Sequence, residues 1–336
     1  MVTTNLTQVR MFVFSGLTDN GELAPFLFIL FLHVYMVTVV GNIGMMAIVH
    51  NNSNLHTPMY FFLSYLSLVD LFYSSVITPK MLSDLISTRK TISFVGCALQ
   101  FFLFAGLACT EVLLLSNMAY DRYAAICHPL HYVSIMTKNI CMCLVVLAFS
   151  IGFLQSSFQT ICVYSLHFCD TILIDHFYCD VPPLLKLSCS DTFSCVLVTV
   201  FFVASCGMGS FIVILISYMF IISSILRMKS AEGRRKAFST CSSHLTCSSI
   251  FYVSVFFTYL RSPSNAIENQ DKIAAVFYSA VTPMLNPLIY SLRNQEVKRV
   301  IIQAMHNITD VDIILSFIRD KVGVLSVTFK LHKTYM

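Results

Sequence analysis

Long apolar runs separated by short polar segments dominate the chain. Seven runs reach the roughly 20 residues that a helix needs to cross a bilayer, and they cover residues 24–49, 57–82, 95–120, 140–163, 195–226, 237–260 and 272–292. Hydrophobic residues make up 57% of the chain and charged residues 11%, whereas soluble domains are about 25% charged. The pattern predicts an all-α membrane protein, a bundle of seven transmembrane helices, with no separate soluble domain.

The positions of lysine and arginine predict the orientation of this bundle. The segment between the fifth and sixth runs carries Arg227, Lys229, Arg234, Arg235 and Lys236 against one glutamate. The segment between the fourth and fifth runs instead carries four aspartates against one lysine. Because short basic loops stay in the cytoplasm, we expect the amino terminus outside and the carboxyl tail inside.

The remaining charge pattern narrows the classes of partner. The net charge of +4 is a sum over two faces of the membrane and indicates no nucleic-acid partner. The basic segment 227–236 is typical of a surface that binds membrane lipid headgroups, a protein partner, or both. Residues 1–22 lack the basic start and apolar core of a cleaved signal peptide.

A charged pair, Asp121 and Arg122, stands where the third run ends, within Met118-Ala-Tyr-Asp-Arg-Tyr-Ala-Ala-Ile-Cys-His-Pro-Leu-His-Tyr132. Ionisable groups at membrane depth are costly and usually mark function. Adjacent residues do not face each other on a helix, so each charge is expected to find a partner on a neighbouring helix. The alternative is a charge pair that only marks the membrane interface.

Four cysteines are expected on the oxidising side of the membrane, namely Cys97, Cys169, Cys179 and Cys189. Four cysteines allow three pairings, and the residues alone do not choose between them. The other nine of the 13 cysteines lie in or beside apolar runs, where a small buried apolar side chain is the default interpretation. A zinc site using His167, His176 and the loop cysteines is an alternative whose spacing fits no standard pattern.

The charged stretch at the end of the third run resembles the corresponding stretch of rhodopsin-like G-protein-coupled receptors, and of odorant receptors in particular. Four further stretches share this resemblance, in the order and at the spacing of the family: Gly41-Asn42, Leu55-His-Thr-Pro-Met-Tyr-Phe-Phe-Leu-Ser64, Lys236-Ala-Phe-Ser-Thr-Cys-Ser-Ser-His-Leu245 and Pro283-Met-Leu-Asn-Pro-Leu-Ile-Tyr-Ser-Leu-Arg-Asn294. The set covers residues 20 to 305. One departure is Phe251-Tyr252-Val253, where the family usually has Phe-Tyr-Gly.

The resemblance implies a ligand cavity that opens outward between the third, fifth, sixth and seventh helices. The positions that it places there are Phe104, Ala105, Ala108, Cys109, Phe202, Cys206, Val255, Tyr259 and Ser279. Mostly apolar walls with a few hydrogen-bonding groups suit a small, uncharged volatile odorant. The fourth run offers little beyond apolar residues. The lysine that binds retinal in opsins would fall at Ala280, and the aspartate that anchors amines would fall at Phe104, so neither ligand is expected.

Two carboxylates, Asp70 and Glu111, lie deep within the apolar runs. The resemblance places them on neighbouring helices that face the interior, with Asn42 and Asn286 beside them, and it implies a bound sodium ion. Two carboxylates in one apolar space do not comfortably both ionise alone. The alternative is therefore a pair that shares a proton, with no ion and no other cofactor.

The resemblance also implies an activation switch and a signalling partner. In the resting state Asp121 restrains Arg122; in the active state Arg122 turns toward Tyr218 and Tyr290. Tyr123 and the Asn286-Pro287 pair complete the set. Pro283 and Pro287 free backbone carbonyls, of which Asn286 can satisfy one. The expected partner is the stimulatory heterotrimeric G protein of olfaction, which raises cyclic AMP. No nucleophile, base or phosphate loop indicates an enzyme.

The resemblance further implies disulfides Cys97–Cys179 and Cys169–Cys189, and a plasma-membrane location in the cilia of olfactory neurons. We expect an extracellular segment 1–23 with a glycosylation site at Asn5, a receptor domain 24–305, and a cytoplasmic tail 306–336 that is atypical of the family. Val297, Val300, Ile301, Ala304 and Met305 predict an amphipathic surface helix after the seventh span.

Two other classes of function have less support in the sequence. A transporter or channel could use Asp70 and Glu111 as a cation path, but the chain shows no internal repeat and no line of polar residues leading outward. An adhesion or scaffold role would leave the Asp121–Arg122 pair without a task.

Overall fold

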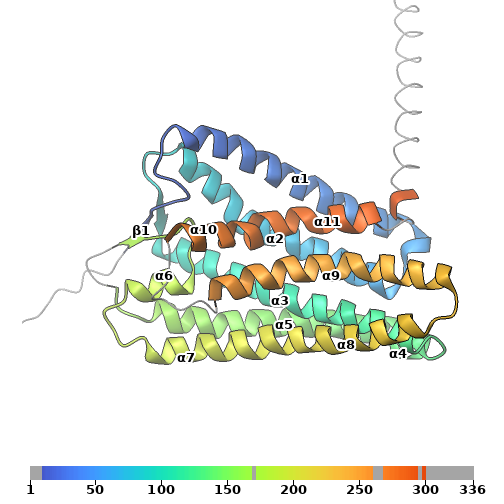
Figure 1. Cartoon of the computed structure of the whole chain (residues 1–336). Coiled ribbons are helices and arrows are strands. Elements are labelled where there is room, and N and C mark those ends of the chain that lie inside the picture. The colour runs from blue at the N-terminus through green and yellow to red at the C-terminus, as the bar shows by residue number, and fades with distance from the viewer. Residues whose placement is uncertain (1–9, 169–171, 260–267, 294–296, 300–336) are drawn as a thin grey trace, which may run out of the picture.

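The computed structural model describes residues 10–168, 172–259, 268–293 and 297–299. It is mostly helical, with long helices lying alongside one another (Figure 1). The α-helices are α1 Leu23–Asn51, α2 Pro58–Ile86, α3 Phe94–Cys127, α4 Tyr132–Ile135, α5 Lys138–Tyr164, α6 Val181–Lys186, α7 Phe193–Phe202, α8 Gly209–Arg227, α9 Ala231–Tyr259, α10 Glu268–Val276 and α11 Thr282–Arg293. A 3₁₀ turn, η1 Ser53–Leu55, and two π-helical turns, η2 Val203–Met208 and η4 Phe277–Val281, connect or interrupt them.

Six helical segments of the described chain are long and apolar enough to cross a membrane. They are α1, α2, α3, α5, the continuous run from α7 through α8, and the run from α10 through α11. α9 corresponds to the remaining predicted span; it is as long as α1 but rich in serine, and it begins with charged residues. This architecture agrees with the predicted bundle of membrane helices.

Two helices are longer than their apolar runs predicted. α3 continues to Cys127, although the run of hydrophobic residues ends at 120. The helix persists because Asp121, which was expected at its edge, is buried and hydrogen-bonded. α9 begins at Ala231, so the basic residues Arg234 and Arg235 lie within its first turns. Hydropathy locates the membrane, whereas a helix ends where its backbone hydrogen bonds end.

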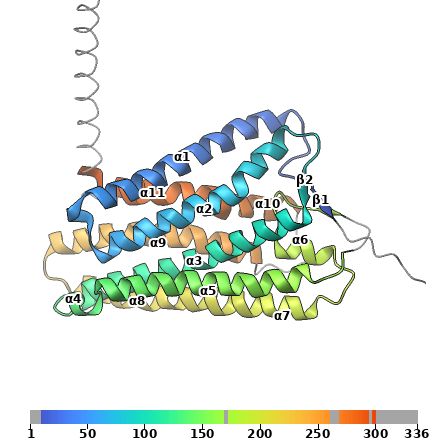
Figure 2. The ribbon, with the colours of Figure 1, turned by 180° about the vertical axis from the view of Figure 1, so that it is seen from behind.

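A small three-stranded sheet corrects the prediction of an all-α chain. β1 Met11–Phe14 lies between β2 Thr91–Ser93 and β3 Leu173–Ile174, antiparallel to β2 and parallel to β3. The strand alternates, so that Phe12 and Phe14 are buried under the sheet. The ring of Phe12 packs against the rings of Phe94 and Phe168. We call the end of the bundle that carries this sheet the sheet end; α4 lies at the opposite end (Figures 1 and 2).

Disulfide bonds reinforce the sheet end. Cys97, in the first turns of α3, is bonded to Cys179. A second bond joins Cys162, near the end of α5, to Cys195, at the start of α7. The interpretation of these last two cysteines as small buried apolar side chains was therefore wrong. Cys189 is also disulfide-bonded, and its expected partner Cys169 lies outside the described residues.

α3 and α5 pack with little space between their backbones. A Cβ atom on Gly152 of α5 would lie 2.6 Å from the backbone oxygen of Gly106 and 2.5 Å from Oγ1 of Thr110. Thr110 and Ser156 add hydrogen bonds across the same interface, to the backbone oxygens of Ala148 and Phe102. Glycine at position 152 is what permits this approach. As a result, the inner face of α5 lies directly against the centre of the bundle.

Candidate ligand cavity and switch region

A cavity of about 110 Å³ lies between α3, α5, α7, η2, α9 and η4 in the half of the bundle toward the sheet end. Its walls are mostly apolar. The residues that line it are Tyr73, Phe101, Phe104, Ala105, Ala108, Cys109, Val112, Gln155, Gln159, Asp180, Val181, Thr199, Phe202, Val203, Cys206, Gly207, Phe251, Val255 and Tyr278. A site of this size and character suits a small, mostly apolar molecule.

Seven of the nine positions expected at a ligand cavity lie on these walls. They are Phe104, Ala105, Ala108 and Cys109 of α3, Phe202 and Cys206 of the α7–η2 segment, and Val255 of α9. Ser279 is buried in η4 but is not among the lining residues. The side chain of Tyr259 lies outside the described residues.

Sequence reasoning missed the part that α5 plays in the cavity. Gln155 and Gln159 of α5 both reach the cavity wall and are 7% and 4% exposed. Their spacing of four residues places them on one face of the helix, the face that packs against α3. Two glutamines at helical spacing in a mostly apolar run were the signal that could have revealed them.

The loop between α5 and α7 covers the cavity from the sheet end. The hydroxyl of Tyr178 donates to Oδ2 of Asp180 and is hydrogen-bonded to the hydroxyl of Tyr278 in η4. Oδ1 of Asp180 accepts from the backbone N–H of Val181 at 2.7 Å and caps α6. Asp180 and Tyr278 therefore line the cavity while holding its cover in place.

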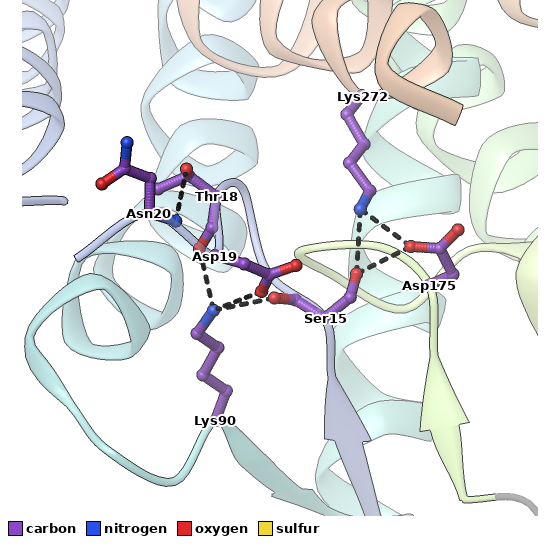
Figure 3. A network of polar contacts seen from close by, with 7 residues as sticks. All are labelled: Ser15, Thr18, Asp19, Asn20, Lys90, Asp175 and Lys272. Carbon is purple, nitrogen blue, oxygen red and sulfur yellow. Dashed lines mark hydrogen bonds and ion pairs between the residues drawn. The ribbon is translucent and has the colours of Figure 1, made fainter. Parts of the chain in front are cut away.

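Ion pairs tie this cover to the rest of the sheet end (Figure 3). Nζ of Lys272 in α10 contacts Oδ1 of Asp175 at 2.8 Å and donates to Oγ of Ser15 at 2.9 Å. Ser15 itself donates to Asp175 at 2.8 Å. The hydrogen bond from Lys272 lowers the pKa of Asp175. Lys90 donates to the backbone oxygens of Ser15 and Thr18. Residues that follow β1, the loop and α10 thus form one network.

His176 lies beneath that network and is 5% exposed. Its ring packs against the rings of Phe177 and Tyr178, and burial lowers its pKa from 6.5 to about 3. The ring is therefore neutral at physiological pH. In the described part of the chain, no three histidine, cysteine or carboxylate side chains are grouped to hold a metal ion, so the zinc alternative at His167 and His176 finds no support there.

A buried polar cluster lies deeper in the bundle, between α1, α2, α3 and α11. Asp70 and Glu111 are each 0% exposed, and Nδ2 of Asn286 donates to Oδ2 of Asp70 at 2.9 Å. Five oxygens are buried without a partner at hydrogen-bonding geometry: Oδ1 of Asn42, Oδ1 of Asp70, Oε1 and Oε2 of Glu111, and Oδ1 of Asn286. Oxygen atoms of this kind are the ligands that hard cations prefer.

The carbonyl freed by Pro287 is bound by α1. Proline at position 287 removes the N–H that would bind the backbone oxygen of Pro283. Nδ2 of Asn42 donates to that oxygen at 3.0 Å. Asn286 was expected to satisfy a freed carbonyl, but it is bound to Asp70 instead. Asn42 therefore links α1 to α11 next to the carboxylate cluster.

At the opposite end of the bundle, Asp121 is buried and contacts two partners. The hydroxyl of Tyr132 in α4 donates to its Oδ1 at 2.8 Å, and the guanidinium of Arg122 lies 3.7 Å from its Oδ2. The Tyr123 hydroxyl is hydrogen-bonded to His128 at 3.0 Å, so it lies on the side of α3 toward that loop. Asp121 thus joins Arg122 to the segment that follows α3.

A buried histidine joins three helices near Arg122. Nε2 of His244 in α9 lies 3.0 Å from the backbone oxygen of Leu115 in α3, and Nδ1 lies 2.9 Å from the hydroxyl of Tyr218 in α8. A carbonyl only accepts, so Nε2 carries the proton; the Tyr218 hydroxyl is hydrogen-bonded to Nδ1 and also donates to the backbone oxygen of Cys241 at 3.3 Å. Tyr290, buried in α11, lies near Cys247 of α9. No role was predicted for His244, although a lone histidine within an apolar run was a visible signal.

Comparisons with known proteins extend over nearly the whole bundle. A family model described as "Olfactory receptor" matches residues 31–308. Mouse olfactory receptor 5B21 is 53% identical over 294 residues, which cover 88% of this chain and 92% of the relative. Human olfactory receptor 5B12 is 52% identical over 294 residues, covering 88% and 94%. Human olfactory receptor 5A1 is 50% identical over 294 residues, covering 88% and 93%.

Proposed function

Since the chain belongs to the olfactory receptor family, we propose that it binds a small volatile odorant in its cavity and then activates the stimulatory olfactory G protein, raising cyclic AMP. The membership confirms the resemblance carried by the motifs. The protein is an odorant receptor, hence a multi-pass membrane protein of the G-protein-coupled class and not an enzyme. The observation that carries the proposal is the mostly apolar cavity that brings together residues from α3, α5, η2 and α9.

The sheet end faces outward in this proposal. Disulfide bonds persist in oxidising compartments, and both Cys97–Cys179 and Cys162–Cys195 lie at that end. The exposed basic residues Arg227, Arg234 and Arg235 lie at the other end, as expected for a cytoplasmic face that meets lipid headgroups. An odorant then enters from outside, and the G protein docks at the end that carries Arg122.

Activation is a shift between two arrangements of the bundle. An odorant that binds the active arrangement more tightly increases its population. In the resting arrangement Asp121 holds Arg122, while Tyr218 is bound to His244. Release of both contacts frees Arg122 and Tyr218 to meet, together with Tyr290, and opens the surface for the G protein. Tyr123 and Pro287 shape the two helices that carry these groups.

A sodium ion belongs to the resting arrangement in this proposal. Asp70 and Glu111 would hold it, with the amide oxygens of Asn42 and Asn286 beside them. The five buried oxygens without partners support this, since a cation would satisfy them and offset the repulsion of the two carboxylates. The ion supplies charge compensation and takes part in no bond chemistry.

Several parts of the proposal concern residues that the structure does not describe. Asn5 would carry a glycan outside the cell, and residues 300–305 would complete a membrane-surface helix that begins near Val297, which is buried. The disulfide of Cys189 would be made with Cys169. Delivery to the cilia of olfactory neurons completes the expected location, with the segment 306–336 as a cytoplasmic tail.

The proposal is tested by measuring cyclic AMP in cells that co-express the olfactory G protein and receive a broad panel of volatiles. Arg122→Ala should abolish the response while surface staining and ligand binding stay near wild-type values. Tyr120→Phe, on the exposed side of α3, is the matched control. A response that survives Arg122→Ala would overturn the switch, and ion flux on stimulation without a G protein would favour the transporter class.

A further inference from the structure

The cavity wall formed by α5 carries two amides that have no partner. Gln155 and Gln159 both line the cavity, and Oε1 of Gln155 is buried without a hydrogen bond. Within the described part of the chain, neither side-chain amide forms a hydrogen bond. Buried polar groups in folded proteins are nearly always hydrogen-bonded, and each exception calls for an explanation such as a bound molecule.

Three other polar side chains on the wall already take part in hydrogen bonds. Asp180 accepts from Tyr178 and from the N–H of Val181. The hydroxyl of Thr199 donates to the backbone oxygen of Cys195 at 2.8 Å, and the hydroxyl of Tyr278 is hydrogen-bonded to that of Tyr178. These contacts bind the cover and the helices to one another. The two glutamine amides remain available to a molecule in the cavity.

The pairing of the two amides is itself a recognition element. Side chains four residues apart on a helix stand about 6 Å apart at their Cβ atoms. One oxygen atom that forms a hydrogen bond of about 2.8 Å with each amide can bridge two amide atoms separated by a comparable distance. Since an amide has both a donor and an acceptor end, two amides can present one of each to the same atom.

Resting on the function proposed above, we propose that Gln155 and Gln159 recognise a hydroxyl group, so that the odorants of this receptor are small neutral alcohols. The hydroxyl donates to one amide and accepts from the other. An ether or a ketone of the same skeleton can only accept, so it leaves an amide oxygen buried and unpaired. A charged ligand is disfavoured, because neutral amides and apolar walls do not compensate for its lost hydration.

Direct binding tests this assignment without any G protein. Purified full-length receptor is heated with alcohols of about four to nine carbons, straight, branched and cyclic, chosen for a small cavity. Each alcohol is matched with its methyl ether and its ketone or aldehyde. We expect alcohols to raise the melting temperature, and the matched ethers and carbonyl compounds to bind about tenfold more weakly or worse.

Substitutions of the two glutamines test whether their amides cause the preference for alcohols. Gln155→Met and Gln159→Met keep the length of the side chain and remove its hydrogen bonds, so each should weaken alcohol binding about tenfold and leave ether binding unchanged. Leu154→Met, on the outward side of the same helix at 61% exposed, should bind alcohols as wild type does. If either methionine variant fails to fold, Gln155→Asn and Gln159→Asn replace it, and the comparison of alcohol with ether in wild type needs no variant.

Three results would overturn the assignment: equal binding of ethers and alcohols, unchanged alcohol binding in both methionine variants, or no binding of any alcohol in the panel. Alcohol binding without a cyclic-AMP response would instead contradict the proposed coupling and leave the assignment standing. The two failures are therefore distinguishable.

Discussion

The carboxylate of Asp121 lies closer to the hydroxyl of Tyr132, at 2.8 Å, than to the guanidinium of Arg122, at 3.7 Å. Arg122 therefore competes for Asp121 with Tyr132 of α4, in the segment between α3 and α5. Hydrogen bonds to a charged group contribute about 1.5–3 kcal/mol, so the contact from Tyr132 is large enough to set how strongly Asp121 attracts its neighbour.

Tyr132→Phe should lower the activity of the receptor in the absence of ligand. The substitution removes the hydrogen bond from Tyr132, so Asp121 attracts Arg122 more strongly. The stronger pair stabilises the resting arrangement. We expect ligand-independent cyclic AMP, normalised to surface staining, to fall severalfold, whereas Asp121→Asn should raise it. Tyr120→Phe serves as the control. Higher basal activity in Tyr132→Phe would contradict this competition between Tyr132 and Arg122 for Asp121.

Sodium should stabilise the purified receptor, and Asp70 and Glu111 should be required for the effect. We expect the melting temperature to rise when sodium chloride replaces choline chloride at equal ionic strength, and the rise to vanish in Asp70→Asn and in Glu111→Gln. Asp175→Asn, in the sheet-end network, is a charge-matched control that should keep it. Identical melting in the two salts would mean that the carboxylates share a proton without an ion.

Gly152→Ala should destabilise the receptor through the contact between α3 and α5. The new methyl group would lie 2.6 Å from the backbone oxygen of Gly106, and backbone cannot rotate away as a side chain can. Overpacking of this kind costs about 1–3 kcal/mol, so we expect a lower melting temperature and less receptor at the surface. Gly44→Ala is the matched control because nothing lies within 4 Å of its Cβ position. Equal stability of the two variants would show that the helices can separate freely.

Acidification should weaken the loop that covers the cavity. His176 is neutral when buried because its pKa is lowered to about 3, but the ring of an undocked loop binds a proton below about pH 6.5. The undocked state therefore binds more protons as the pH falls from about 6.5 toward 3. The free energy that keeps the loop docked decreases accordingly, by up to about 1.4 kcal/mol per pH unit. The lowered pKa of Asp175 acts in the same direction at still lower pH, since its bond to Lys272 is lost on protonation.

The melting temperature of the purified receptor between pH 7 and 5 measures this effect. We expect a decrease in wild type that is smaller in His176→Phe, because phenylalanine takes up no proton. His167→Asn, at an exposed position of the same loop, should behave as wild type does. A pH dependence that is unchanged in His176→Phe would place the titrating group elsewhere.

The positions of the membrane helices could be predicted because the bilayer imposes one length and one kind of surface on all of them. The ends could not be predicted as well. Asp121 extends α3 by finding Tyr132, a residue beyond the apolar run. β1 pairs with two strands, of which one is only two residues long. A strand this short has no detectable alternation of hydrophobic and polar residues in the sequence.

The cavity was foreseeable in part. Positions such as Phe104 and Cys206 follow from the family motifs, which fix the helices that carry them. Gln155 and Gln159 were missed because the sequence does not show which face of α5 packs against α3. That face is determined by the close approach of the two helices at Gly152. The Cys162–Cys195 bond was missed for a similar reason, since it depends on how two helix ends meet.

The central position of β1 has a consequence for how the protein is made. The strand leaves the ribosome before the first span, yet its partner β3 follows about 160 residues later in the sequence. At ordinary rates of synthesis, about 5–20 residues per second, β1 waits several seconds or longer for that partner. Closure of the sheet is therefore a late event in biogenesis, and a closed sheet marks a molecule whose first four spans and following loop have all been inserted.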